Sequence, residues 1–232
     1  MESLVNKIKK LKNSKIKKII DNRMYEFSLF CKKNFNDIFK ELCFCILTAN
    51  FTAERGIIIQ TKIGNGFLTY SEKKIAKKLK ELGHRFPNMR AKFIFEARQH
   101  IPELKKRLKE IGHKNYHNKK LTKKAFIEEQ HELRDWIAKN IKGLGMKESS
   151  HFLRNICFKD VAILDFHIID ILVDNKVIIR PKTSTGKITK TLTPKKYLEI
   201  EKKLDKLCKT TNLSQAELDL YLWYLETGKV LK

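Results

Sequence analysis

The sequence predicts an all-α protein. Apolar residues recur at helical spacing through most of the chain, and residues that cap or break helices stand between these stretches. The one β-like run, Val177–Ile179, is too short to predict a sheet. The chain has 232 residues, of which 42% are hydrophobic, enough for one or two cores. We therefore expect about ten or eleven helices.

The charge of the chain indicates its class of partner. Fifty Lys and Arg residues face 26 Asp and Glu residues, which gives a formal net charge of +24. Such an excess favours a polyanion, with nucleic acid first and an anionic membrane surface second. No apolar run approaches the roughly 18 residues that a membrane span needs, and no signal peptide is expected. We expect a cytoplasmic, nucleoid-associated protein without a membrane partner.

Cysteine and histidine spacing gives no sign of a metal site. No C-x-x-C pair occurs among the five cysteines, and the seven histidines are dispersed. We expect reduced, mostly buried cysteines, and neither a metal nor a cofactor. The cysteines are Cys31, Cys43, Cys45, Cys157 and Cys208.

Helical patterns fill the first half of the chain. Glu2–Cys31 is basic with apolar residues near the 3.6 period, and Phe35–Thr48 is apolar enough for a buried helix. Thr52 is placed to cap the next helix. Further helices are predicted from Ser71 to Gly83 and over Met89–His100.

The second half contains long helices and basic connections. Ala125–Lys142 has one apolar stripe, Thr193 precedes a proline that opens another helix, and Leu213–Glu226 is the last helix. Two lysine-rich connections, at about 111–125 and 180–193, are expected to be loops.

A glycine hairpin lies near the middle of the second half. Gly143 and Gly145 separate two helical stretches, and both can adopt positive φ and bring the backbone close to another surface. The free N–H groups at the start of the second helix suit a phosphate, so we expect both glycines to contact DNA. Lys147 lies at this helix start. The apolar run Val161–Leu164 ends at Asp165, which is placed to cap the following helix.

Lys147 and Asp165 are the candidate catalytic residues. A protonated ammonium is no nucleophile, so a reactive Lys147 needs burial or nearby positive charge, which the helix start and the basic chain supply. The alternative is that Lys147 only contacts phosphate. Asp165 favours catalysis, because a rigid, ionised carboxylate would stabilise an oxocarbenium ion at a sugar carbon. Its capping role is compatible with this.

Two further positions are candidates for nucleic-acid contact. Phe86 lies between Arg85 and Pro87 in a loop between helices. It is either a hydrophobic staple or a platform that stacks on a base, with Arg85 as a neighbouring DNA contact. His167, two residues after Asp165, either helps to hold a phosphate or is a locally bonded surface histidine.

Several motifs together resemble the helix-hairpin-helix glycosylase superfamily, and within it the archaeal-type 8-oxoguanine DNA glycosylase/AP lyases. The resemblance covers most of the chain. The residues that carry it are Lys142–Glu148, His151–Asn155, Asp165–His167, Glu41–Glu54, Gly83–Phe86, Glu217–Tyr221 and Trp223–Lys232.

The resemblance implies a two-lobed helix-hairpin-helix DNA glycosylase architecture with the active site in the cleft between the lobes. We expect 1–50 and 166–232 to form a terminal lobe, and 51–165 to form a middle lobe that ends in the helix-hairpin-helix 130–158.

The resemblance also implies an activity. A monomer would bind double-stranded DNA, flip out 8-oxoguanine and excise it through Lys147, then nick the strand on the 3′ side by β-elimination through a Schiff base. Asp165 would activate the lysine, and Phe86 and Trp223 would form the aromatic pair of the base pocket. The terminal carboxylate of Lys232 would accept the N7–H that distinguishes 8-oxoguanine from guanine.

Two alternatives remain at this point. One is a helix-hairpin-helix protein that binds DNA without cutting it. The other is a glycosylase/lyase for oxidised pyrimidines. Such enzymes usually carry a four-cysteine cluster after the catalytic region, and this alternative is disfavoured because only Cys208 follows Asp165 here.

Overall fold

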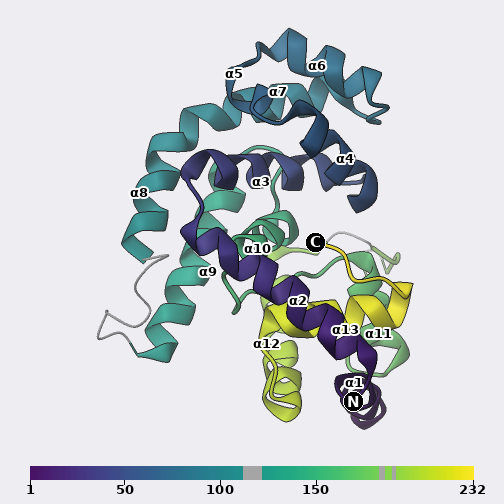
Figure 1. The fold of residues 1–232 in the computed structure, drawn as a ribbon. Helices are drawn as coiled ribbons and strands as arrows, with labels where there is room; N and C mark the ends of the chain where they lie inside the picture. Colours follow the sequence, from purple (N-terminus) through teal and green to yellow (C-terminus); the bar gives the residue numbers. More distant parts are fainter. Residues whose placement is uncertain (112–121, 183–185, 190–191) are drawn as a thin grey trace. The chain divides into compact units, whose positions relative to one another are not determined.

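The computed structural model describes residues 1–111, 122–182, 186–189 and 192–232 (Figure 1). Over these residues the protein is all-α, as predicted, with thirteen α-helices and two short 3-10 helices. An isolated antiparallel bridge joins Lys182 to Ile188, and the described residues form no strand. Much of the basic connections predicted at 111–125 and 180–193 lies outside the described residues. None of the helices described is long and apolar enough to cross a membrane.

Contacts divide the chain into two compact units. Unit 1 comprises 1–26 and 159–231, and unit 2 comprises 27–158 together with Lys232. The sequence-based boundaries differ, since they place the helix at Phe35–Thr48 with the terminal segments. In the structure this helix packs against four helices of the middle of the chain. The two units are described separately below.

Unit 1 is built from the first and last helices of the chain. α1 packs against α12 and α13, and α11 packs against α13. The α-ammonium of Met1 donates to the carbonyl of Asn175 at 3.2 Å, and Lys12 Nζ donates to the carbonyl of Thr211 at 2.6 Å. These two contacts tie α1 to the ends of α11 and α12. The helices are α1 (Glu2–Lys12), most of α2 (Lys15–Leu29), α11 (Phe166–Asp174), α12 (Pro194–Thr211) and α13 (Gln215–Thr227).

The helix ends of unit 1 are defined by capping residues in the local sequence. Thr193 Oγ1 accepts the N–H of Lys196 at 3.3 Å. Ser214 and Glu217 form a capping box at the start of α13, and Gly228 ends that helix in the left-handed region with φ +70°. Local sequence therefore defines where α12 and α13 begin.

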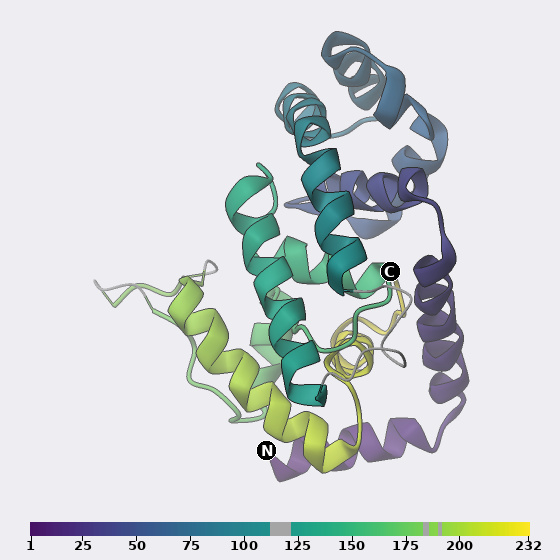
Figure 2. The same cartoon turned by 90° about the vertical axis from the view of Figure 1, so that its left-hand side faces the viewer.

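Unit 2 is organised around α3. Nine of its fourteen residues are buried, because α4, α5, α7 and α10 pack around it. α8 and α9 lie side by side in this unit (Figure 2). The elements are η1 (Phe30–Lys32), α3 (Phe35–Thr48), α4 (Ala53–Ile63), α5 (Gly66–Thr69), α6 (Glu72–Glu81), α7 (Pro87–Ala97), η2 (Arg98–His100), α8 (Ile101–Ile111), α9 (Lys123–Asn140) and α10 (Met146–Asn155).

Two side chains satisfy carbonyls at the end of α3, which have no partner within the helix. His84 Nε2 lies 3.0 Å from the carbonyl oxygen of Leu47, and Arg90 donates to the carbonyl of Ala49 at 2.6 Å. The N–H of Phe86 donates to His84 Nδ1 at 3.0 Å, so His84 carries its proton on Nε2. The loop that carries Phe86 is therefore fixed to α3.

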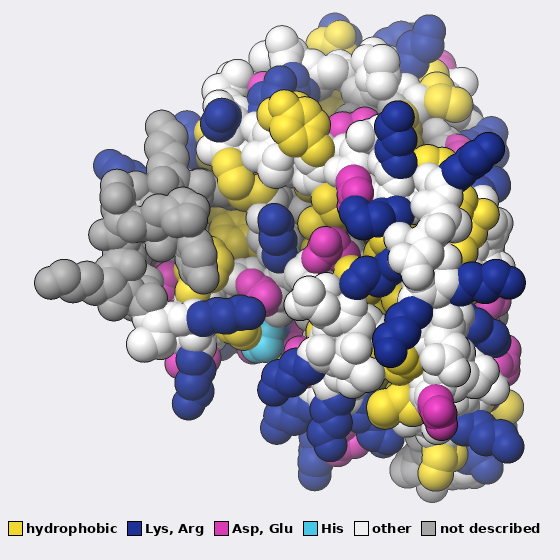
Figure 3. Space-filling view, turned by 60° about the horizontal axis from the view of Figure 1, so that its bottom comes forward, with side chains coloured by type: hydrophobic (Ala, Val, Ile, Leu, Met, Phe, Trp, Pro, Cys, Tyr) yellow, Lys and Arg dark blue, Asp and Glu magenta, His cyan; other side chains and the backbone are white. Residues whose placement is uncertain are grey.

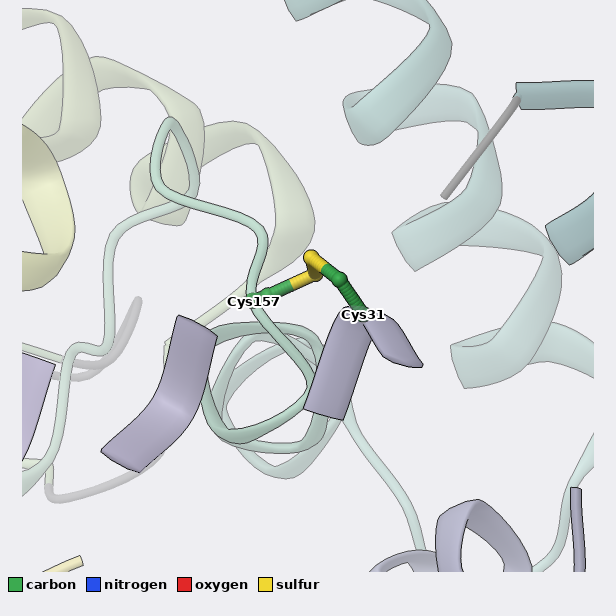
Figure 4. The surroundings of a disulfide bond; sticks show 2 residues. All are labelled: Cys31 and Cys157. Atoms are coloured by element: carbon green, nitrogen blue, oxygen red, sulfur yellow. A yellow bond between two sulfur atoms is a disulfide. The ribbon is translucent and has the colours of Figure 1, made fainter. Parts of the chain in front are cut away.

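A disulfide joins Cys31 to Cys157 within unit 2 (Figure 4). The prediction that the cysteines are reduced is wrong for this pair. The two residues are 126 positions apart, and the folding of α3 and α10 against each other brings them within reach. Cys43, Cys45 and Cys208 are free and buried, as predicted.

Candidate active site

The glycine hairpin joins α9 to α10. Gly143 has φ +88°, and a Cβ atom there would lie 2.6 Å from the ring of Phe93. Only glycine fits this position without strain. Gly145 has φ −88° and ψ −170°, which any residue can adopt, so of the two glycines only Gly143 uses the positive φ that glycine permits. Leu144, between the two glycines, is buried and anchors the hairpin.

Lys147 is the second residue of α10, immediately after the hairpin. Its side chain is 30% exposed, and Nζ lies 2.9 Å from Oε1 of Glu148. The other oxygen of Glu148 accepts the N–H of Gly145 at 3.3 Å. One carboxylate therefore holds both the candidate nucleophile and the hairpin backbone. Sequence reasoning gave Glu148 no role, although an acidic residue three positions after a helix N-cap is a known capping signal.

Asp165 is held by its own helix and by the segment before it. Its Oδ1 accepts the N–H of Ile168 at 2.9 Å, which confirms the predicted N-cap of α11. The buried segment before it is fixed at Ala162, whose N–H donates to Glu201 Oε1 at 2.8 Å and whose carbonyl accepts from the Tyr197 hydroxyl at 2.6 Å. α12 thus fixes the segment that leads into α11.

Asp165 is followed by an aromatic group in unit 1. The ring of His167 lies 3.9 Å from that of Phe166 and 4.7 Å, edge-on, from that of Trp223. Trp223 Nε1 is buried without a hydrogen-bond partner among the described residues. Two predicted site residues, His167 and Trp223, are therefore in contact.

The other predicted residues lie in unit 2. Phe86 is half-buried at the N-cap of α7, where Pro87 occupies the first helical position. The exposed Arg85 places its guanidinium 4.9 Å from the centre of the Phe86 ring. Lys232, the last residue, contacts α3 and α4 through its ammonium group. Lys147 also belongs to this unit, whereas Asp165 belongs to unit 1.

The charge of the surface agrees with a polyanionic ligand. Lys and Arg side chains are widespread on the face drawn in Figure 3, with fewer acidic ones between them. Within the part of the chain that is described, no group of three or more His, Cys, Asp or Glu residues could hold a metal ion.

Comparison with known proteins decides the family. A family model described as 8-oxoguanine DNA glycosylase matches residues 20–213. The chain belongs to the 8-oxoguanine DNA glycosylase family. It is 49% identical over 229 residues to the 8-oxoguanine DNA glycosylase/AP lyase of Methanocaldococcus jannaschii, with 99% of each chain covered.

Solved structures of this family share the fold. The M. jannaschii 8-oxoguanine glycosylase/lyase in complex with a 15mer DNA containing 8-oxoguanine is 47% identical, with a TM-score of 0.84 over 99% of this chain and 100% of that one. The 8-oxoguanine DNA glycosylase of Thermotoga maritima is 35% identical, with a TM-score of 0.82 over 100% and 99%. These matches confirm the all-α fold and the family resemblance inferred from the motifs.

Other residues around the glycosylase motifs have roles that the sequence did not predict. His84 fixes the backbone of Phe86, while Glu41 and Gln60 hold the side chain of Lys232. One signal was available: Glu41 is a charged residue within the buried helix α3, and buried acids need partners.

Proposed function

We propose that this protein excises 8-oxoguanine from double-stranded DNA and nicks the strand on the 3′ side of the resulting abasic site. The observation that carries the proposal is Lys147 on the first turn of α10, directly after a glycine hairpin, in a chain of the 8-oxoguanine DNA glycosylase family. The relatives named above, as glycosylase/AP lyases and in a complex with damaged DNA, support both steps.

The hairpin and its basic surroundings bind the DNA. The backbone at Gly143 and Gly145 approaches a phosphate, which the N–H groups at the start of α10 bind. Arg85 and His167 add further contacts to the backbone of the flipped nucleotide. The net charge of +24 supplies the salt-dependent part of the affinity.

Lys147 performs the chemistry. Its amine attacks C1′ of the sugar, and the bond to the base breaks as the damaged base leaves and takes up a proton. The aminated sugar opens to a Schiff base between Nζ and C1′. Loss of a proton from C2′ then breaks the C3′–O bond and releases the phosphate on the 3′ side. Asp165 takes the proton of the lysine and stabilises the cationic sugar.

The reactive form of Lys147 requires that its ion pair with Glu148 opens. While the pair lasts, Nζ carries a proton and has no free lone pair.

Selection of the base uses stacking and one acceptor. Phe86 and Trp223 stack on the flipped base. The terminal carboxylate of Lys232 accepts the N7–H of 8-oxoguanine, whereas guanine offers an acceptor there and would leave two acceptors facing each other. No cofactor or metal is needed for this sequence of steps.

We further infer that the protein acts as a monomer in the cytoplasm, associated with the nucleoid, because chromosomal DNA is its substrate.

Borohydride trapping tests the proposal. It reduces a Schiff base, so the wild-type protein should form a covalent adduct with a duplex containing 8-oxoguanine, and Lys147→Gln should not. Lys142→Gln, which alters an exposed lysine of the same hairpin, is the matched control and should still be trapped. Strand nicking of a thymine glycol duplex measures the alternative substrate. The proposal fails if active protein forms no adduct with the 8-oxoguanine duplex, or if Lys147→Gln is trapped normally.

A further inference from the structure

The last residue of the chain is held by its side chain. Lys232 Nζ lies 2.9 Å from Oε2 of Glu41 and donates to Oε1 of Gln60 at 2.7 Å. The same ammonium lies 4.3 Å from the centre of the Phe44 ring. Only 18% of the Lys232 side chain is exposed. Lysine is rarely buried unless it is paired, so this side chain lies in a defined site.

Glu41 is the centre of that site. It is 1% exposed, and its Oε1 accepts from Asn155 Nδ2 at 2.7 Å. Its Oε2 accepts from Gln60 Nε2 at 3.0 Å, in addition to the contact with Lys232. Lys232 is the cation paired with Glu41 among the residues that the structure describes. A buried carboxylate is strongly destabilising without its cation, so Glu41 requires Lys232 in place.

The partners of Glu41 are themselves fixed. Gln60 Nε2 also donates to the carbonyl of Lys40 at 2.9 Å. Asn155 Oδ1 accepts from the guanidinium of Arg154 at 3.1 and 3.2 Å. Each of these side chains therefore has a defined orientation, and together they define one position for the Lys232 ammonium.

The main-chain end of Lys232 has a neighbour of its own. His151 lies beside the backbone of Lys232, and its ring lies edge-on to Phe44 at 5.7 Å. Lys147 lies one turn before His151 on α10. The ammonium of Lys232 is thus held by α3 and α4, and its main chain lies beside α10.

We propose that Glu41 is a positioning residue for base selection: by pairing with the Lys232 ammonium, it fixes the terminal carboxylate where the N7–H of 8-oxoguanine arrives. This inference rests on the proposed function. Discrimination between 8-oxoguanine and guanine depends on one hydrogen bond of defined geometry, and a free chain end would provide no fixed acceptor. Gln60 supports the same position through its contact with the Lys232 ammonium.

The test compares base excision with cleavage of a preformed abasic site on the same duplex under single-turnover conditions. Cleavage of the abasic site needs no base selection, so the ratio of the two rates isolates recognition of the base. Three variants are measured: Glu41→Gln, Lys232→Met, which keeps the terminal carboxylate, and the double variant. Lys229→Met, three residues before the end of the chain and exposed, is the matched control.

A positioning role predicts that the excision-to-cleavage ratio falls about tenfold or more in Glu41→Gln and in Lys232→Met, as expected for one lost hydrogen bond in the transition state. The double variant removes both charges and should recover stability to urea without recovering the ratio. Lys229→Met should keep the ratio.

Two outcomes overturn the inference: an unchanged ratio in Glu41→Gln and Lys232→Met, or a ratio that recovers with stability in the double variant, which would indicate a structural role only. Failure of the proposed function is distinguishable, since the wild-type protein would then neither excise 8-oxoguanine nor be trapped on it.

Discussion

Lys147 Nζ lies 2.9 Å from Oε1 of Glu148, the next residue on α10. Adjacent residues on a helix do not face each other, so this contact depends on both side chains turning toward the hairpin. Glu148 is held there because its other oxygen accepts the N–H of Gly145. The ion pair is therefore part of the hairpin. It holds the Lys147 side chain next to the surface where we propose that DNA binds.

Replacing Glu148 separates its two roles. Glu148→Ala removes the cap and should lower the free energy of unfolding by about 0.5–1 kcal/mol, whereas Glu148→Gln keeps an acceptor for Gly145 and should cost less. Urea unfolding measures both. Glu148→Gln should also be trapped by borohydride several-fold faster, because the ion pair that holds Lys147 Nζ at the hairpin is lost and the amine is free to reach the sugar.

A remote ion pair provides the control for this prediction. Glu81→Gln breaks the exposed pair with Lys78, whose atoms lie 2.8 Å apart, and should leave trapping unchanged. Slower trapping in Glu148→Gln than in the wild type would show that the Glu148 carboxylate assists catalysis and does not merely hold Lys147 at the hairpin.

Gly143→Ala tests the hairpin backbone. The new methyl group would enter a positive φ and approach the Phe93 ring to 2.6 Å, so we expect a loss of about 2–4 kcal/mol of stability from strain and overpacking together. Gly186→Ala is the control, because Gly186 has φ +79° with nothing within 4 Å and should lose only about 1 kcal/mol. Equal losses in the two variants would contradict the close approach to Phe93. Chemical denaturation of both proteins gives the comparison.

Local features of the fold could be predicted from the sequence because neighbouring residues determine them. Asp165 and Ser214 cap their helices through the N–H three residues on, and Gly228 ends α13 with positive φ. The glycine hairpin and the lysine after it are equally local. The sign of φ at Gly143 and Gly145 was not predictable, since glycine allows both signs and the sequence does not choose between them.

Pairings across long separations could not be predicted in the same way. Glu41 and Lys232 are 191 positions apart, and Cys31 and Cys157 are 126 apart. Which partners meet depends on how α3, α4 and α10 pack, and one sequence contains no record of that packing. A charged residue in an apolar helix indicates that a partner exists, but it does not identify the partner.

The Cys31–Cys157 disulfide should be measurable in solution. Without reductant, the unfolded protein should show three reactive thiols, and five after reduction. Reduction, or the Cys31→Ser variant, should lower the free energy of unfolding by about 2–4 kcal/mol, because the cross-link restricts the unfolded chain. Cys208→Ser removes a thiol outside the bridge and is the control. Reductant should lower its free energy of unfolding by as much as it lowers that of the wild type. Five thiols before reduction would exclude the bridge.

Two histidines make stability depend on pH. Burial lowers the pKa of His84, as does nearby Arg90, although the hydrogen bond to Leu47 opposes the shift. Burial, with the neighbouring cations led by Arg154, holds the pKa of His151 well below its usual value. Both are neutral in the folded protein at pH values where the unfolded chain binds protons. The free energy of unfolding should therefore be constant above about pH 7 and fall as the pH drops below about 6.5.

Urea titrations between about pH 7.5 and about pH 5.5 follow this loss, and His151→Gln should reduce its slope. His131→Gln, at a half-buried position, serves as the control for the loss of an imidazole elsewhere in the chain. Stability that stays constant over the whole range would contradict the buried, neutral state of the two rings.

Replacing Asp165 separates its role as the N-cap of α11 from the role of its negative charge. Asparagine caps a helix about as well as aspartate, so Asp165→Asn should keep the bond to the N–H of Ile168 and retain stability within about 0.5 kcal/mol. It removes the carboxylate, however, and with it the group that takes the lysine proton and stabilises the cationic sugar. We expect 8-oxoguanine excision to fall by about 100-fold or more. Asp165→Ala should lose both the activity and about 1 kcal/mol of stability. If Asp165→Asn excised the base at the wild-type rate, Asp165 would be a cap alone, and the proton of Lys147 would have to leave by another route.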